Sequence, residues 1–122
     1  MFKKYSEIMY DGGFEHPITI TFPANNFSMK LTGEGGNRHL VLYDGNGSVD
    51  LWVDTHCDEK EAYIHSIHIE GNPSARFLYY IMSMLQDYTF RVEHHFWWFT
   101  LDRLDRMFQD MYNDMLHGYI SH

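Results

Sequence analysis

The hydrophobic pattern of this chain changes its period once, near residue 72, and this change limits the folds that the chain can adopt. Before that point apolar and polar residues alternate in short runs, as at residues 18–22 and 27–32, which is the period-two pattern of half-buried strands. After it, apolar residues recur every three to four positions, as they do in amphipathic helices. The sequence therefore predicts strands first and helices second.

Five strands are expected in the first part of the chain, separated by turn residues. The clearest turn is Asp-Gly-Asn-Gly-Ser at residues 44–48, because glycine and asparagine tolerate the positive φ that a tight hairpin requires. Pro-Ala-Asn-Asn at residues 23–26 is a second turn. The five expected strands cover residues 18–22, 27–32, 39–43, 49–54 and 62–69.

Two helices and one further strand are expected in the second part. The first helix spans residues 73–87 with Asn72 as its N-cap. The second helix begins after Thr100, a capping residue, and ends at Gly118. Residues 90–99 are aromatic and β-branched, which favours a strand between the helices.

These elements predict the α+β class, with a mostly antiparallel sheet of about five to six strands and two helices packed on one face. Hydrophobic residues make up 44% of the chain and aromatic residues 17%, which is ample for one core. No repeat or linker interrupts the pattern, so residues 1–122 are expected to form a single domain.

Acidic residues outnumber basic ones by 17 to 9, which gives a formal net charge of -8 with neutral histidines. Nucleic acids and anionic membranes bind to clustered Lys and Arg. Direct binding to either is therefore not expected. The expected partner is a protein with a basic surface, including one that itself binds nucleic acid, such as a bacterial defence protein.

The acidic residues gather in two places. The segment 44–61 holds six acids against Lys60 alone: Asp44, Asp50, Asp54, Asp58, Glu59 and Glu61. The second helix, on the face opposite its apolar stripe, is expected to present Asp102, Asp105, Asp110 and Asp114. Such spaced carboxylates can imitate DNA phosphates to a protein that binds them, although a solvated helix face is the simpler interpretation.

Trp52 lies between Asp50 and Asp54 in the fourth expected strand, on the face opposite the apolar residues of that strand. A tryptophan among carboxylates on a solvent face is a candidate binding hot spot, unless a second layer covers this face. The candidate partner-binding residues are Asp44, Asp50, Trp52, Asp54, Asp58, Glu59, Asp102, Asp105, Asp110 and Asp114.

The sequence contains no recognisable catalytic or cofactor motif, so neither a catalytic residue nor a cofactor is predicted. His65 and His68 are three residues apart on an expected strand and should point to opposite faces, which prevents them from chelating one ion. A better metal-ligand set is Asp54, His56 and Asp58. A divalent-metal enzyme that uses these three residues is therefore the alternative to a binding protein.

The chain is expected to work in the cytoplasm, which is that of the host cell if a phage encodes it. Cys57 is the only cysteine, so an intrachain disulfide cannot form and a reducing compartment is indicated. No apolar run reaches the roughly 20 residues of a membrane span. The first residues also lack the apolar stretch of a signal peptide.

We expect a small non-enzymatic protein that binds and inhibits another protein, as a monomer or a homodimer. In size, charge and lack of catalytic motifs it resembles the inhibitors that phages carry against bacterial defence, including anti-restriction and anti-CRISPR proteins. The resemblance is one of type, because no stretch matches a family motif. The alternatives among binding proteins are an immunity protein that neutralises a cognate toxin and a self-associating structural protein.

Overall fold

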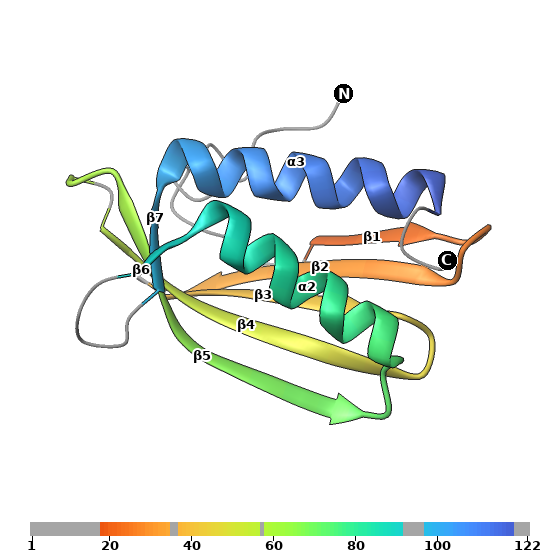
Figure 1. Cartoon of the computed structure of the whole chain (residues 1–122). Coiled ribbons are helices and arrows are strands. Elements are labelled where there is room, and N and C mark those ends of the chain that lie inside the picture. The colour runs from red at the N-terminus through yellow and green to blue at the C-terminus, as the bar shows by residue number, and fades with distance from the viewer. Residues whose placement is uncertain (1–17, 35–36, 57, 92–96, 119–122) are drawn as a thin grey trace.

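The computed structural model describes residues 18–34, 37–56, 58–91 and 97–118. These residues form seven strands and two helices (Figure 1). Their order is β1 (Ile18–Phe22), β2 (Phe27–Glu34), β3 (Asn37–Tyr43), β4 (Gly47–His56), β5 (Glu61–Gly71), α2 (Ala75–Tyr88), β6 (Phe90–Arg91), β7 (Trp97–Thr100) and α3 (Leu101–His117).

The strands form one sheet in the order β1-β2-β3-β4-β5-β7-β6, and every neighbouring pair is antiparallel. The first five strands follow one another as a meander, because strands that are consecutive in the sequence are neighbours in the sheet. In the hairpin between β3 and β4, Gly45 has a φ of 94°, which glycine adopts without steric penalty. The predicted α+β class and antiparallel sheet are confirmed.

Both helices pack on the same face of the sheet (Figure 1). Apolar side chains from β1 to β5, β7, α2 and α3 fill the space between the two layers, and the largest fully buried ones are Met29, Leu31, Leu40, Leu42, Leu51, Phe77, Ile81, Leu85, Phe99 and Phe108. Burying one such side chain stabilises the fold by roughly 1.5–3 kcal/mol. The core therefore holds both described helices to one face of the sheet.

The helix boundaries confirm the prediction at three of four ends. Thr100 caps α3, with its Oγ1 accepting a hydrogen bond from the backbone N–H of Arg103 at 3.2 Å, and Gly118 ends α3 with a φ of 72°. The prediction of Asn72 as the cap of α2 was wrong. Ser74 caps this helix through its Oγ, while the backbone N–H of Asn72 donates to Asn46 O at 3.1 Å.

The prediction of one strand over residues 90–99 was also wrong. This segment contains two short strands, β6 and β7, which pair with each other so that Phe90 lies opposite Trp98. Phe99 is fully buried in the core, whereas Trp97 and Trp98 are half-buried.

Neither α2 nor α3 has the length and apolar character needed to cross a bilayer.

Candidate functional site

The face of the sheet opposite α2 and α3 is the candidate functional site. No helix or strand among the described residues covers it (Figure 1). Along β4, Val49, Leu51 and Val53 point into the core, while Trp52 is 39% exposed on the opposite face. The predicted orientation of Trp52 is confirmed. We call the sheet face opposite the two helices the uncovered face. It bears the side chains that alternate with the core residues.

The strand register arranges the side chains of the uncovered face in rows that run across the sheet. Residues directly opposite each other in antiparallel strands share a face, so each row can be followed from strand to strand. Trp52 lies in a row of Thr32, His39, Trp52 and Ser66. The adjacent row is Thr19, Lys30, Val41, Asp50 and His68.

The indole of Trp52 is held in place by its neighbour on β3. The His39 and Trp52 rings are stacked, with centroids 3.8 Å apart and planes 10° apart. His39 Nε2 lies 3.4 Å from Asp50 Oδ2, a close contact that lacks hydrogen-bond geometry. Asp50 Oδ1 in turn accepts a hydrogen bond from Ser48 Oγ at 3.2 Å. This cluster therefore presents an ordered aromatic surface beside a carboxylate.

Two further histidines approach carboxylates of the uncovered face. His65 Nδ1 lies 3.5 Å from Asp54 Oδ2, and His68 Nε2 lies 3.5 Å from Glu70 Oε1. The prediction that His65 and His68 point to opposite faces was wrong, because the register of β4 and β5 shifts between Trp52 and Val53. This β-bulge leaves His65 unpaired and redirects its side chain.

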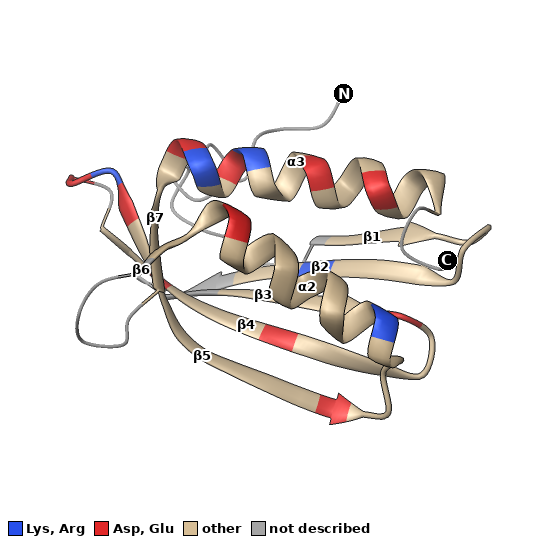
Figure 2. Cartoon of the chain, viewed as in Figure 1, with Lys and Arg blue, Asp and Glu red and all other residues tan. Residues whose placement is uncertain are grey.

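Charge on the uncovered face is predominantly negative. Among its described side chains, the acids are Asp50, Asp54, Glu61 and Glu70, and Lys30 is the one lysine or arginine. Figure 2 shows acidic positions on β4, on β5 and at the turn between them. The pKa of Tyr63 is raised, first by the hydrogen bond that its hydroxyl donates to Glu61 Oε2 at 2.6 Å. Tyr63 therefore stays a neutral donor beside this carboxylate.

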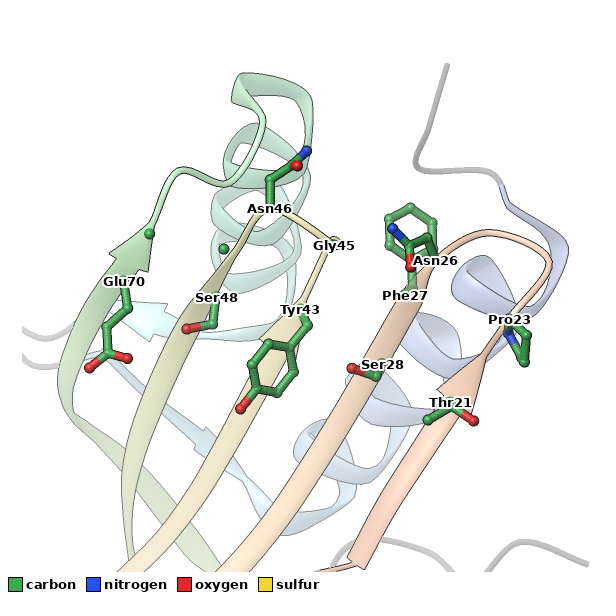
Figure 3. A pocket seen from close by; sticks show the side chains of 12 residues that line it. Thr21, Pro23, Asn26, Phe27, Ser28, Tyr43, Gly45, Asn46, Ser48 and Glu70 are labelled. Carbon is green, nitrogen blue, oxygen red and sulfur yellow. The ribbon is translucent and has the colours of Figure 1, made fainter.

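A shallow groove of about 760 Å³ lies at one end of the uncovered face, below the turns at residues 23–26 and 44–46. Its floor is one complete row across five strands, shown side by side in Figure 3: Thr21, Ser28, Tyr43, Ser48 and Glu70. Four hydroxyl groups and a carboxylate can accept hydrogen bonds from a cationic side chain. The groove thus extends the polar surface beyond Asp50.

Aromatic side chains occupy the opposite end of the sheet. Trp98 lies opposite both Tyr63 and Phe90 in the register, and its ring centroid is 4.8 Å from that of Phe90. The guanidinium of Arg103 sits 4.1 Å from the centroid of the Phe90 ring, a cation–π distance. These contacts tie β6 and β7 to the start of α3.

Asp44, one of the predicted binding residues, makes hydrogen bonds within the protein. Its Oδ1 accepts hydrogen bonds from the backbone N–H groups of Asn46 at 2.9 Å and Gly47 at 3.1 Å. Its Oδ2 accepts one from the N–H of Ser74 at 2.6 Å. Both oxygens are therefore used to join the β3–β4 hairpin to the start of α2.

The predicted outward row of acids on α3 was wrong for three of its four members. Asp105 is only 6% exposed. Asp114 Oδ2 accepts a hydrogen bond from the hydroxyl of Tyr80 at 2.5 Å, and Asp110 accepts one from Tyr88. Asp110 and Asp114 lie in the seam between α2 and α3, because α3 packs against both the sheet and the other helix.

The remaining predicted acids are exposed and lie away from Trp52. Asp58 and Glu59 occupy the turn between β4 and β5, and Asp102 lies in the first turn of α3. The two places are adjacent, because the backbone N–H of Leu101 donates to Lys60 O at 3.0 Å. The structure therefore brings Asp50, Trp52 and Asp54 together and separates them from these three acids.

The predicted metal set is not assembled. Within the described ranges, no three His, Cys, Asp or Glu side chains are grouped so that they could hold a metal ion. Asp54 faces His65 instead, and the ring of His56 packs edge-on against Tyr63 with centroids 5.3 Å apart. Cys57 lies outside the described residues.

Sequence reasoning missed His39, Tyr43 and Glu70 as members of the site. Period-two alternation placed the polar residues of each strand on one face, but it did not say which residues of different strands lie opposite each other. That alignment depends on the register between strands. The predicted turns at residues 23–26 and 44–48 were the signals that bear on it, for β1 against β2 and for β3 against β4.

The fold and the site define a two-layer α+β protein with one helix-covered sheet face and one acidic, aromatic, exposed face. No protein-family model, curated protein or solved structure matches the chain.

Proposed function

We propose that this chain is a non-enzymatic protein that binds another protein through the uncovered face of its sheet and inhibits it by covering its working surface. Trp52 is the apolar anchor of this interface, and Asp50 and Asp54 are its charged neighbours. One observation supports the proposal above others: Trp52 is 39% exposed and yet held by the His39 ring at a centroid distance of 3.8 Å.

A held tryptophan suits binding for an energetic reason. An exposed side chain that is ordered only on association loses about 0.5–1.5 kcal/mol of conformational freedom. The stacking of Trp52 on His39 restricts the indole before a partner arrives. Tryptophans in such positions are among the residues that contribute most to binding.

The charge of the face favours a basic partner. Asp50, Asp54, Glu61 and Glu70 oppose Lys30 alone among the described charged side chains there. Complementary charge raises the association rate and the specificity more than the final affinity. A bacterial defence nuclease binds a polyanion through a basic surface, and the acidic uncovered face would complement that surface.

Imitation of DNA by an α3 acid row receives no support, since Asp105, Asp110 and Asp114 make contacts within the protein. If the chain does imitate DNA phosphates, the acids of the uncovered face would do so. An immunity protein that blocks a toxin would use the same face, so only the identity of the partner separates these two functions.

The test compares variants of the two sides of the protein. The immobilised chain, its Trp52→Ala variant and its Asp54→Lys/Glu70→Lys variant, which reverses two exposed charges of the uncovered face, are exposed to bacterial lysates that contain candidate defence nucleases, at low and high salt. Bound proteins are identified by mass spectrometry. The matched control is Asp87→Lys/Asp102→Lys, which makes the same charge change at two exposed helix positions.

We expect one partner that the natural chain and the helix control retain and that both sheet variants lose. With that partner purified, Trp52→Ala should weaken Kd about 30-fold, because a central tryptophan contributes about 2 kcal/mol. Addition of the natural chain should also suppress the partner's activity. Equal retention by all four proteins would place the interface elsewhere, and binding without loss of activity would refute inhibition.

A further inference from the structure

Among the described residues, most of β5 lies at an edge of the sheet. β7 pairs with β5 only at Glu61, Ala62 and Tyr63. From Ile64 to Gly71, the outer side of β5 has no paired strand among the described residues. Figure 1 shows this part of β5 at the margin of the sheet. Eight residues thus present backbone N–H and C=O groups on alternate sides, with one side open to a further strand.

The side chains of this edge are also open to solvent. Every residue from His65 to Gly71 is exposed. Ile67 and Ile69 lie opposite Leu51 and Val49 of β4, on the helix-covered side of the sheet, and are 37% and 51% exposed. The helices therefore do not fully cover β5, and an apolar strip remains beside its free backbone groups.

The edge carries few of the devices that block strand addition. Proteins protect long edges with lysine, proline or short strands, and residues 64–71 contain neither lysine nor proline. A bulge at His65 marks the start of the free segment, and the residues after it pair regularly with β4. Regular alternation over residues 66–70 is the form that a further antiparallel strand requires.

We propose that the occupant of this edge is β5 of a second copy of this chain, paired antiparallel about a two-fold axis at His68. In this register Ile67 lies opposite Ile69 of the second copy, and Ile69 opposite Ile67 of the second copy. Both apolar residues therefore meet apolar residues on the same face. The pairing extends from residue 65 to residue 71, which is nearly the whole free edge.

Other symmetric registers fit the edge less well. An axis at Ile67 would place Ile69 opposite His65 of the second copy, where the bulge interrupts the strand. An axis at Ile69 would place Ile67 opposite Gly71 of the second copy and shorten the ladder, because the chain turns after Gly71 to bond Asn72 to Asn46. An axis between two residues would bring opposite faces together.

The acidity of the chain does not oppose this pairing strongly. Residues 64–71 hold one acid, Glu70, together with His65 and His68, so most of the charge of -8 lies away from the edge. Repulsion between the distant charges of two copies is screened within about 8 Å at physiological salt. Alternating isoleucines on one side and a nearly neutral polar row on the other make this edge self-complementary.

The dimer would join two sheets into one and place both uncovered faces side by side. Each copy would keep its Trp52 accessible, since β5 binds through its edge and not through its face. This inference does not rest on the proposed function. It would, however, give that function two binding faces in one particle, which strengthens binding to a partner that also has two sites.

Sedimentation equilibrium of the natural chain over increasing concentration tests the dimer. We expect the average mass to rise from 14.6 kDa toward twice that value. Ile67→Lys/Ile69→Lys should weaken the dimer about 100-fold, because it removes two cross-strand apolar pairs and adds like charges. The control is Tyr79→Lys, at an apolar side chain that is 77% exposed on α2, and it should dimerise normally.

A cysteine cross-link tests the register. In a Cys57→Ser background, His68→Cys should form an intermolecular disulfide on mild oxidation, since two residues on the axis lie within the 4.4–6.8 Å that a disulfide spans between Cα atoms. Glu70→Cys should not, because the two copies of residue 70 would be about 13 Å apart along the strands. A natural chain that stays monomeric, or a cross-link at residue 70 but not at 68, would overturn the proposal.

Discussion

Replacing Tyr80 by phenylalanine tests whether the polar seam between α2 and α3 stabilises the fold. The Tyr80 hydroxyl donates to Asp114 Oδ2 at 2.5 Å across the two helices. Burial raises the pKa of Tyr80, and the hydrogen bond to Asp114 raises it further. The hydroxyl therefore remains protonated and keeps its partner throughout the neutral range. Tyr80→Phe removes one hydroxyl and leaves the ring in place.

The expected loss follows from the charge of the acceptor. A hydrogen bond to a charged group contributes about 1.5–3 kcal/mol, and we take about 1.5 kcal/mol because both side chains are half-buried. Unfolding 122 residues changes entropy by about 0.26 kcal/mol per degree. Tyr80→Phe should therefore lower Tm by about 6 °C.

The assay is thermal unfolding followed by circular dichroism, with Tyr79→Phe as the control. Tyr79 is 77% exposed, so the same change there should alter stability by less than about 0.5 kcal/mol. The folded pKa of Tyr80 lies above its unfolded value, so its contribution is complete below pH 10 and declines as pH rises through the folded pKa. Equal Tm values for Tyr80→Phe and Tyr79→Phe would refute the role of the seam.

Two further predictions concern acids within the fold. Burial first, and the charge of Asp114 second, raise the pKa of Asp110 above 3.8; its contribution to stability is thus greatest below that pH and is lost as pH rises through its folded pKa. Asp110→Asn should remove this pH dependence. In thermal melts of both proteins at a series of pH values, the Tm of the natural chain relative to that of the variant should therefore rise as pH falls. Asp44→Ala removes the carboxylate that accepts hydrogen bonds from three backbone N–H groups. It should lower the free energy of unfolding, measured by urea titration, by about 1.5 kcal/mol. The control Asp58→Ala, in an exposed turn, should change the free energy of unfolding by less than about 0.5 kcal/mol.

Much of the fold could be predicted because local chemistry and tertiary packing agree in β1 to β5 and α3. Period-two alternation predicted these strands, and glycine and asparagine predicted the β3–β4 turn. Thr100 and Gly118 predicted the two ends of α3. The segment Asn72-Pro73-Ser74 offered two capping residues. Ser74, which caps the helix, is also held by Asp44, thirty residues earlier, whose Oδ2 accepts a hydrogen bond from the N–H of Ser74 at 2.6 Å. No local pattern contains that contact.

The division of residues 90–99 had a similar cause. Their composition correctly indicated strands, but Phe90 pairs with Trp98 of the same segment, and Ala62 pairs with Phe99. A composition rich in aromatic and β-branched residues favours extended backbone without saying where the chain reverses. Likewise, the bulge at His65 changed the direction of one side chain, although the strand itself was predicted correctly.

The acids of α3 show why net charge alone gives an incomplete description of a binding surface. A helix on the surface of a sheet has one buried stripe, but α3 has two neighbours, and the position of α2 decides which polar residues lie between them. Tyr80 and Tyr88 engage Asp114 and Asp110 there. Acids used in this way accept hydrogen bonds within the protein and are not presented to a partner. The binding hypothesis therefore depends on the sheet, where Asp50 and Asp54 flank an exposed tryptophan. A charge reversal at Asp54 and Glu70, whose side chains are 40% and 67% exposed, should affect binding far more than stability.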